Sequence, residues 1–431
     1  MPSEKTKAGN DSGNGRHAFH PSYHYLVLVC CCIMAGVTVG FFNSAYGTFY
    51  TSLSLHFHTG RGQVTIHATI SLIVTALTAP FSVKLAKKYG LRICLLFSLI
   101  LQTASLLLIL PATRIWQLNL LGVIRGIGGA FMHVPIITII LTNWYLDHVG
   151  MGMGITFSMA SGFGAIFSWL ISFMIQQVNY RFALVACSVI LVLLSLPTLI
   201  FLRLRPEELH MHPHGWHPSD GSSVASSAAK WQEIRKSTPF YRIPDFYLLC
   251  AFGLLTVPVV AMQMHFSGFC EQIGAGSMFG GIMMSTVMFG SVIFKLVIGE
   301  ILDLLGAFKM MASVLTVDIL SLFIIYSNRS WSGNGTLLLI GAFLFGVHAS
   351  IGSIGIAGVT RAVLGDRDDG TAFSIVSSCA STGAALSITV IAVLFDLTRS
   401  YDVSFLLGIG LLFSGCVILF ILWKRKQAGV S

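Results

Sequence analysis

Very few ionisable side chains interrupt the long apolar stretches of this 431-residue sequence, and these few are the candidates for chemistry. Lys295 and Arg125 are bases, Asp318 is an acid, and His133 and His348 can take up a proton near neutral pH. A charge inside a bilayer costs at least ~2.5–3.5 kcal/mol on insertion scales, so such a residue commonly faces a cavity, a substrate or a partner. The two bases outnumber the single acid, which favours an anion as the bound solute.

Lys295 ends the apolar run 288–294, and no acidic residue follows on the same stretch before Glu300. An Arg would stay charged and bind a carboxylate through two hydrogen bonds, whereas a buried Lys can lose its proton and regain it when an anion arrives. Proton and anion would then enter together, without a carboxylate relay. The alternative is that Lys295 extends along its helix to the lipid headgroups.

Arg125 and Asp318 are each open to a structural interpretation as well. Arg125 is expected in the outer half of its helix, where it contacts either the substrate and gate or a structural partner. Asp318 lies deep in the apolar run 314–319. It is therefore either protonated or paired with a neighbouring helix, with proton coupling as the functional alternative.

Histidines and neutral hydrogen-bonding residues extend this candidate set. His133 and His348 differ by 215 positions, and His265 lies near the expected outer end of its helix. A lone His in a membrane helix is most often a hydrogen-bonding partner between helices, but the near-symmetric pair favours a functional role. Asn43 and Tyr46 would add neutral hydrogen bonds to the same cavity, although Tyr is also a common anchor at the membrane surface.

The composition identifies the elements that must position these residues. Only 10% of the residues are charged and 55% are hydrophobic, with a mean hydropathy of +0.80. A soluble domain has roughly 25% charged residues, so a soluble enzyme is excluded, as are disordered, collagen-like and coiled-coil chains. Nine scattered Cys, three of them adjacent at 30–32, exclude a secreted disulfide scaffold. We therefore predict an all-α polytopic membrane protein.

Apolar runs long enough for a membrane-crossing helix, about 20 residues, recur along the chain. The twelve predicted spans are 24–50, 63–83, 92–111, 115–140, 150–175, 182–202, 245–268, 276–298, 309–326, 336–360, 370–395 and 402–423. They predict a cytoplasmic tail (1–22), an N-terminal six-helix bundle (23–203), a cytoplasmic loop (204–243), a C-terminal six-helix bundle (244–423) and a cytoplasmic tail (424–431).

Lys and Arg residues are unevenly divided between the two sides of this arrangement. With the N-terminus in the cytoplasm, the inner loops and tails hold 19 of them and the outer loops hold five. Because cytoplasmic loops carry the excess of Lys and Arg, both termini are predicted to be cytoplasmic, in a plasma-membrane protein that we expect to be a monomer. The net charge of +9 then reflects this topology and predicts no nucleic-acid partner. The polar first 20 residues do not resemble a cleaved signal peptide.

The two halves of the sequence repeat each other. Residues 83–90 match 299–306, and residues 156–159 match 372–375, both at an offset of 216. Two six-helix halves related by a parallel repeat are typical of alternating-access transporters, whose site lies between the halves near the middle of the membrane.

The pattern Gly299-x-x-x-Asp303-x-x-Gly306 resembles the loop signature of the major facilitator superfamily, in its second-half copy. The first-half copy has Val83 and Lys87 at the Gly and Asp positions and keeps Lys88, Gly90 and Arg92. The resemblance covers essentially the whole chain. It implies a twelve-helix fold, transport instead of catalysis, and a gating role for these loop residues.

Several segments resemble, more narrowly, the branch of monocarboxylate transporters and oxalate/formate antiporters, namely 46–49, 126–129, 150–164 and 205–209. In that branch a cation four residues before the matching Gly pairs with the substrate carboxylate, which implies this role for Lys295. The acid that can precede that cation by four residues is replaced by Ser291. His265 resembles a His common in bacterial members of the branch, which points to a bacterial relative.

The remaining motifs narrow the function further. The central loop has four His within 210–217, which suit either a metal such as zinc or, as we expect, a flexible linker. No Walker, dinucleotide-binding or HExxH motif occurs, so we predict neither an ATP-driven pump nor a cofactor or metal. The predicted function is transport of a small organic anion, a monocarboxylate or dicarboxylate, by proton symport or anion exchange. The alternatives are transport of a neutral or cationic solute and, in a different class, a non-transporting solute receptor.

Overall fold

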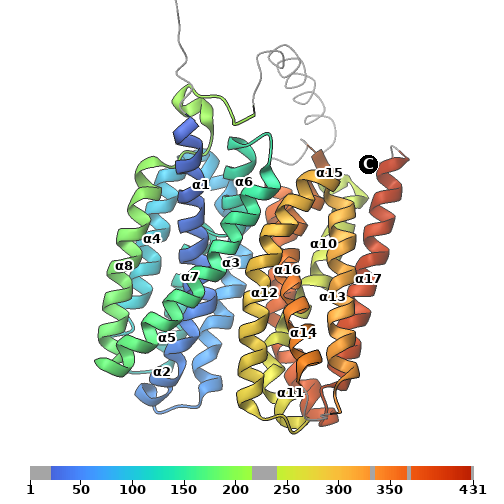
Figure 1. The fold of residues 1–431 in the computed structure, drawn as a ribbon. Coiled ribbons are helices and arrows are strands. Elements are labelled where there is room, and N and C mark those ends of the chain that lie inside the picture. The colour runs from blue at the N-terminus through green and yellow to red at the C-terminus, as the bar shows by residue number, and fades with distance from the viewer. Residues whose placement is uncertain (1–20, 216–239, 331–334, 366–369, 429–431) are drawn as a thin grey trace, which may run out of the picture.

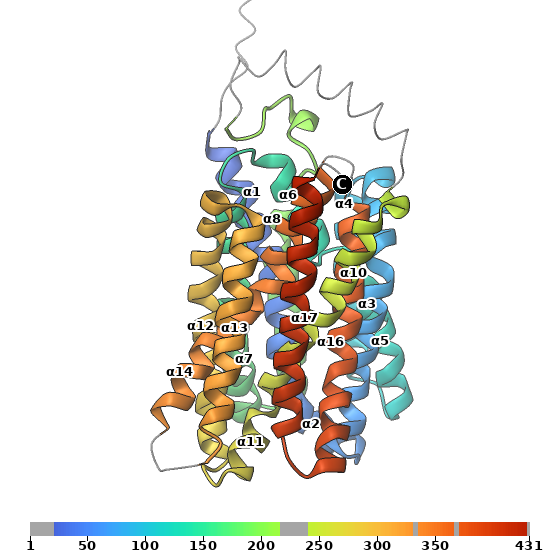
Figure 2. The same cartoon turned by 90° about the vertical axis from the view of Figure 1, so that its right-hand side faces the viewer.

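The computed structural model describes residues 21–215, 240–330, 335–365 and 370–428, and it is built from helices, which confirms the predicted fold class. Figure 1 shows two helical bundles side by side, one from each half of the chain. We call the side where α1 begins and α17 ends the terminal side, and the opposite side the far side (Figures 1 and 2). Most of the predicted N-terminal tail lies outside the described residues.

The helices follow the predicted spans closely. The N-terminal bundle contains α1 (Pro21–Ala35), η1 (Gly36–Ser44), η2 (Ala45–Phe49), α2 (Tyr50–Phe57), α3 (Arg61–Tyr89), α4 (Leu91–Leu107), α5 (Ile115–Ala130), α6 (Val134–Trp144), α7 (Val149–Gln177) and α8 (Tyr180–Phe201). Two short helices follow, η3 (Pro206–Leu209) and η5 (Phe240–Arg242). The C-terminal bundle contains α10 (Pro244–Thr256), η6 (Val257–His265), α11 (Phe266–Gln272), α12 (Ser277–Leu305), α13 (Ala307–Ser327), α14 (Thr336–Phe345), η7 (Gly346–Ser350), η8 (Ile351–Gly355), α15 (Ile356–Leu364), α16 (Thr371–Thr398) and α17 (Asp402–Gln427).

Eleven helical spans in the described residues are long and apolar enough to cross a membrane. The one remaining predicted span, the third (92–111), corresponds to α4, whose 17 residues lie at the lower end of the spanning range. Several helices extend beyond the predicted ends. For example, α17 continues to Gln427, so the predicted tail at 424–431 begins within a helix.

The internal repeat is visible at two glycines that lie 216 positions apart. Gly90 ends α3 with φ +89° and Gly306 ends α12 with φ +77°, and each directly precedes the next helix. Residues with a side chain rarely adopt this backbone conformation. Both halves therefore make the same sharp turn between their second and third spans.

Four spans are interrupted near their middle, and they are the first, fourth, seventh and tenth. Span 1 passes through the π-helical η1 and the 3-10 helix η2, and span 4 breaks between α5 and α6, just before Pro135. Span 7 contains the 3-10 helix η6, and span 10 contains η7 and η8. Irregular turns inside membrane helices are tolerated where they are buried in protein or line a cavity. Each three-helix unit of the repeat therefore begins with a broken helix.

The two halves touch along α7 and α12 on the terminal side. The hydrogen bonds between these helices join residues 150–161 of α7 to residues 291–303 of α12. Gly150 and Gly299 lie so close that a Cβ on either residue would fall on the carbonyl oxygen of the other. A second contact forms where α16 begins, because Gly370 lies against Ile139 of α6.

Towards the far side the facing surfaces separate. About one turn beyond Ser291, Met288 of α12 is 41% exposed, and Gly281 two turns further is also exposed. The buried apolar residues divide in the same way. One core joins the C-terminal half to the terminal side of the N-terminal half, and a second core belongs to the far side of the N-terminal half. The halves are therefore packed together on the terminal side and apart on the far side.

Part of the predicted central loop is packed against the N-terminal half. The indole N–H of Trp144 donates to the carbonyl of Arg203 over 2.9 Å, and the backbone N–H of His214 donates to the carbonyl of Trp144 over 2.8 Å. The rings of His24 and His214 lie 5.6 Å apart. Residues 203–214 therefore form a docked segment, in contrast to the flexible linker expected there. Within the described residues no group of three or more His, Cys, Asp or Glu is placed to hold a metal ion.

Candidate functional site

Lys295 lies at the contact between the two halves. Its side chain is 6% exposed, and the ammonium Nζ donates to the Phe157 carbonyl over 3.2 Å and to Ser161 Oγ over 3.0 Å, both on α7. Ser291, one turn before Lys295 on α12, lies 3.3 Å from the Ser161 hydroxyl. The ammonium therefore points into protein between the halves, which rules out the alternative in which it extends to the headgroups.

Arg125 lies in a second polar cluster, inside the N-terminal half. Its side chain is 6% exposed and Nε donates to Ser71 Oγ of α3 over 3.0 Å. The guanidinium carbon lies 4.4 Å from the centre of the Tyr46 ring, a cation–π contact. His67 Nε2 is 3.2 Å from the Tyr46 hydroxyl. The broken span 1 thus brings the buried Tyr46 onto Arg125, while Asn43 on the same span is exposed.

Both buried cations are held by neutral groups. Among the described residues, neither Lys295 nor Arg125 lies within ion-pair distance of a carboxylate. Isolated buried charges are costly, and hydrogen bonds from hydroxyls, carbonyls and a ring face offset that cost only in part. Each position would gain from a negatively charged group beside it.

The loop signature after span 8 has a clear structural role. Asp303 accepts hydrogen bonds from the backbone N–H groups of Gly150 and Met151, each over 2.8 Å. These donors are among the first N–H groups of α7, which have no partner within their own helix and favour a negative charge. Asp303 of one half therefore caps a helix of the other half, and Gly299 allows the close approach that this cap requires.

The first-half copy of the signature is arranged differently. Gly90 makes the turn described above, Lys88 lies over the ring of Tyr89 at 5.1 Å, and Arg92 donates to the carbonyl of Ile200 at the end of α8. These contacts are local or lie within the N-terminal half. The second copy is thus the one whose acid bridges the halves.

The histidines predicted as a set lie in separate places. His348 of η7 is 2% exposed, and its Nδ1 is 2.6 Å from Asp318 Oδ2 of α13. His133 precedes α6 at the break in span 4. His265 ends η6, where its ring packs 5.8 Å from that of Tyr401. Asp318 is therefore paired with a neighbouring helix, which was one of its two structural interpretations.

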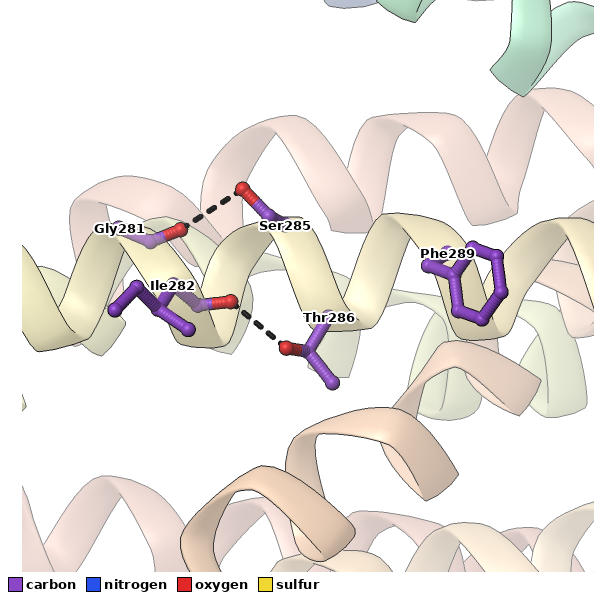
Figure 3. A pocket seen from close by; sticks show the side chains of 5 residues that line it. All are labelled: Gly281, Ile282, Ser285, Thr286 and Phe289. Atoms are coloured by element: carbon purple, nitrogen blue, oxygen red, sulfur yellow. Dashed lines mark hydrogen bonds between the residues drawn. The ribbon is translucent and has the colours of Figure 1, made fainter.

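A groove of about 450 Å³ runs along the far-side part of α12 (Figure 3), lined by Gly281, Ile282, Ser285, Thr286 and Phe289. The Ser285 and Thr286 hydroxyls both donate to carbonyls of their own helix, over 3.1 and 2.8 Å. No charged side chain lines this groove, so it offers little to recognise an ionic solute.

Sequence reasoning missed the groups that hold the two cations. Ser161 and the Phe157 carbonyl hold Lys295, and Ser71 holds Arg125. A signal for Ser161 does exist, because small residues recur along one face of α7 at 150, 154, 158 and 161, with the spacing of a helix contact. We find no comparable signal for Ser71.

Two helical halves that meet on one side, contain broken helices and each bury a cation, one of them at the contact between the halves, have the architecture of a solute transporter. A comparison with family models bears this out. The model of the Major Facilitator Superfamily matches residues 32–280, more than half of the sequence. The chain belongs to this superfamily, whose members are transporters and not enzymes.

Two curated relatives are similar in sequence. An "MFS-type transporter" of Gibberella moniliformis is 23% identical over 368 residues, which cover 84% of this chain and 82% of the relative. The "Probable transporter MCH2" of Saccharomyces cerevisiae is 23% identical over 233 residues, covering 53% of this chain and 46% of the relative. These matches do not separate the branches of the superfamily, so the monocarboxylate or oxalate/formate branch and a bacterial source stay predictions.

Two solved structures share the fold. The proton:xylose symporter XylE, bound to 6-bromo-6-deoxy-D-glucose, superimposes with a TM-score of 0.72 at 12% identity, covering 94% of this chain and 96% of XylE. The human organic anion transporter MFSD10 (TETRAN) gives a TM-score of 0.65 at 15% identity, covering 92% and 98%. At these identities the similarity establishes the fold alone.

Proposed function

We propose that this protein carries a small organic anion, a monocarboxylate or dicarboxylate, by alternating access, coupled to protons or to a counter-anion. One observation carries the proposal. Lys295 and Arg125 are buried cations, one in each half, and among the described residues neither has a carboxylate partner. An anionic substrate would supply the missing charge, which is the role that resemblance to the monocarboxylate branch implies for Lys295.

The contacts of Lys295 suggest how anion binding and movement are linked. In this conformation the ammonium donates to Phe157 and Ser161 across the contact between the halves. A carboxylate is a stronger acceptor than a carbonyl or a hydroxyl, so it would compete for the same donor. An anion that takes over the ammonium would weaken the contact between α7 and α12 and favour opening on the terminal side.

Arg125 would act from the N-terminal half as the second cation. Its aromatic and hydroxyl neighbours fix the guanidinium, which binds carboxylates with two parallel hydrogen bonds. His133, His265, His348 and Asn43 were included in the predicted binding set. Of these, we retain His133 and Asn43 as candidate contacts, because His348 is paired with Asp318 and the ring of His265 packs against Tyr401.

The similarity to MFSD10, described as an organic anion transporter, is consistent with this substrate class, whereas XylE is described as a sugar symporter. The buried charges favour an anion, because a neutral solute would leave both buried cations without a counter-ion. For location we propose the plasma membrane, with both termini in the cytoplasm and a monomeric protein. The topology is supported by the 19 inner and five outer Lys and Arg residues.

Uptake into proteoliposomes tests the proposal. The probes are labelled lactate, formate and oxalate, with xylose as the neutral control, each with and without a pH gradient. We expect uptake of at least one carboxylate and none of xylose. The variant Lys295→Gln should lower carboxylate uptake roughly ten- to hundredfold, since a hydrogen bond to a charged group contributes about 1.5–3 kcal/mol.

The matched control is Lys309→Gln, because Lys309 is an exposed lysine on the neighbouring α13. This variant should transport like the parent protein. Carboxylate uptake that survives Lys295→Gln unchanged contradicts the proposed role of Lys295. Uptake of xylose instead of the carboxylates would favour the neutral-solute alternative.

A further inference from the structure

The C-terminal half contains a buried acid–base pair away from the contact between the halves. Asp318 of α13 is 0% exposed and His348 of η7 is 2% exposed. Asp318 Oδ2 lies 2.6 Å from His348 Nδ1, and His348 Nε2 lies 3.3 Å from the carbonyl oxygen of Val257. The ring of Phe345 stacks on His348 with centroids 5.3 Å apart. The pair therefore joins α13 to the interrupted parts of spans 7 and 10.

The hydrogen bonds of His348 fix the number of protons on the pair. A backbone carbonyl can only accept, so Nε2 must carry a hydrogen to bond with Val257. The 2.6 Å contact between Nδ1 and Oδ2 requires a second hydrogen, located on either atom. The pair thus holds two protons and is neutral overall, whichever atom holds the second one.

Loss of one proton would be incompatible with this arrangement. The remaining proton could satisfy either the contact with Val257 or the contact with Asp318, and the other contact would then bring two lone pairs together. The pair would also acquire a net negative charge in buried surroundings. Asp318 Oδ1 is already buried and has no hydrogen-bond partner among the described residues, so that charge would be poorly stabilised.

We infer that Asp318 and His348 form a proton-binding site whose occupancy determines how the broken helices of spans 7 and 10 pack, and thereby couples a proton to transport. The neutral, doubly protonated pair belongs to the conformation described here. Release of its proton to water, once the helices open, separates His348 from Asp318 or from Val257. Proton uptake restores both bonds. This inference rests on the proposed anion transport and assigns its coupling ion.

No other neighbouring ionisable group within the described residues is bonded to Asp318 or His348. On the elements that pack around it, the ionisable groups within the described residues are Lys295, Glu300 and Asp303 (α12), Lys309 and Tyr326 (α13), His265 (η6), Arg361 (α15), and Asp402, Cys416, Lys424, Arg425 and Lys426 (α17). Neither Asp318 nor His348 has a hydrogen bond or ion pair with any of these groups.

Direct packing connects this site to Lys295. A Cβ on Gly346 of η7 would lie 2.6 Å from the backbone nitrogen of Ser291 on α12. The Ser291 hydroxyl contacts Ser161, which accepts from Lys295. A shift of η7 on proton release would therefore press on the turn of α12 that faces the Lys295 contact. This is a steric route between the proton site and the proposed anion site.

Two transport measurements in proteoliposomes test the inference. The probe is the labelled carboxylate (lactate, formate or oxalate) that the parent protein exchanges. Asp318→Asn should keep exchange at equal pH within about twofold of the parent, because exchange needs no proton release. Accumulation driven by a pH gradient should fall about tenfold or more, because an amide has no proton to give up. His348→Gln should behave in the same way.

The matched control is Ser404→Ala, which changes another buried polar side chain of this half and should leave both activities like the parent. Parent-level accumulation in Asp318→Asn overturns the inference, because the pair would then be merely structural. Failure of the parent to exchange any of the three carboxylates instead overturns the proposed function.

A spectroscopic measurement keeps the inference testable if the variants do not fold. Infrared difference spectra of the parent protein, with isotope labels on the aspartate carboxyls and on the histidine rings, should show the loss of one proton from the pair during transport of the carboxylate probe. The lost signal is either a protonated aspartate band or an imidazolium band, depending on which atom holds the second proton. Absence of both changes also overturns the inference.

Discussion

Removal of the Asp303 carboxylate should shift the protein towards a form that is open on the terminal side. Asp303 accepts from the Gly150 and Met151 N–H groups over 2.8 Å each, and these bonds exist only while α7 and α12 are in contact. A carboxylate that caps a helix stabilises it by about 1–2 kcal/mol relative to Ala. This range lies at or below the roughly 1.5–3 kcal/mol expected for hydrogen bonds to charged groups, because Asp303 is exposed and screened by water. Asp303→Ala should therefore raise the ratio of open to closed molecules roughly 5- to 30-fold.

Fluorescence energy transfer between dyes at the ends of the two helices measures this ratio. Leu146→Cys and Leu304→Cys suit the labels, since the two leucines are 45% and 74% exposed while the nine native Cys are buried or half-buried. Glu300→Ala is the control, because it removes the same charge from an exposed position on the same helix. Equal populations in Asp303→Ala, Glu300→Ala and the parent would refute the capping role of Asp303.

Three further changes have expected outcomes. Gly150→Ala would place its Cβ on the Gly299 carbonyl, so transport should fall about tenfold or more. The control Gly162→Ala changes a residue of the same helix that has open space around it, so transport should stay near that of the parent. Equal uptake in both variants would contradict the tight contact between α7 and α12. Gly306→Ala forces a side chain into a conformation with φ +77°, and thermal unfolding should show a loss of about 1–3 kcal/mol; an unchanged melting temperature would argue against strain at this turn. Arg125→Lys keeps the charge but loses the planar group above Tyr46, so carboxylate uptake should still fall by about fivefold or more, and parent-level uptake would mean that charge alone suffices at this position.

The helices could be predicted from the sequence because each must satisfy its own backbone hydrogen bonds within a long apolar stretch. The loop at Gly306 could also be identified, because its signature consists of a few residues that are close together in the sequence. The partner of Asp303 could not, because Gly150 lies 153 positions away in the other half. The breaks in spans 1, 4, 7 and 10 were also not anticipated, although Pro135 and Pro258 lie at two of them, because prolines are also tolerated within intact membrane helices such as α3 and α8.

The ionisable residues of the candidate site could be predicted from the sequence, but the groups that they contact could not. Lys295, Arg125 and Asp318 were identifiable because ionisable residues are rare in apolar runs. Their partners are a backbone carbonyl, serine hydroxyls and a ring face, which nearly every helix offers somewhere. His348 and Asp318 were given separate roles from the sequence, and the 30 positions between them give no indication that they touch. Only the packing of η7 against α13 brings them together.

The docked segment 203–214 determines where the tether between the two bundles begins. The chain leaves α8 at Phe201, but it remains bonded to the ends of α1 and α6 as far as His214. A bicistronic version expressed as two separate polypeptides would therefore keep both bundles intact if divided just after Gly215. A division at Leu202 would instead separate the docked segment from the first bundle, and Trp144 would lose its hydrogen bonds with Arg203 and His214. Both division points nevertheless lie in the same stretch between the sixth and seventh spans.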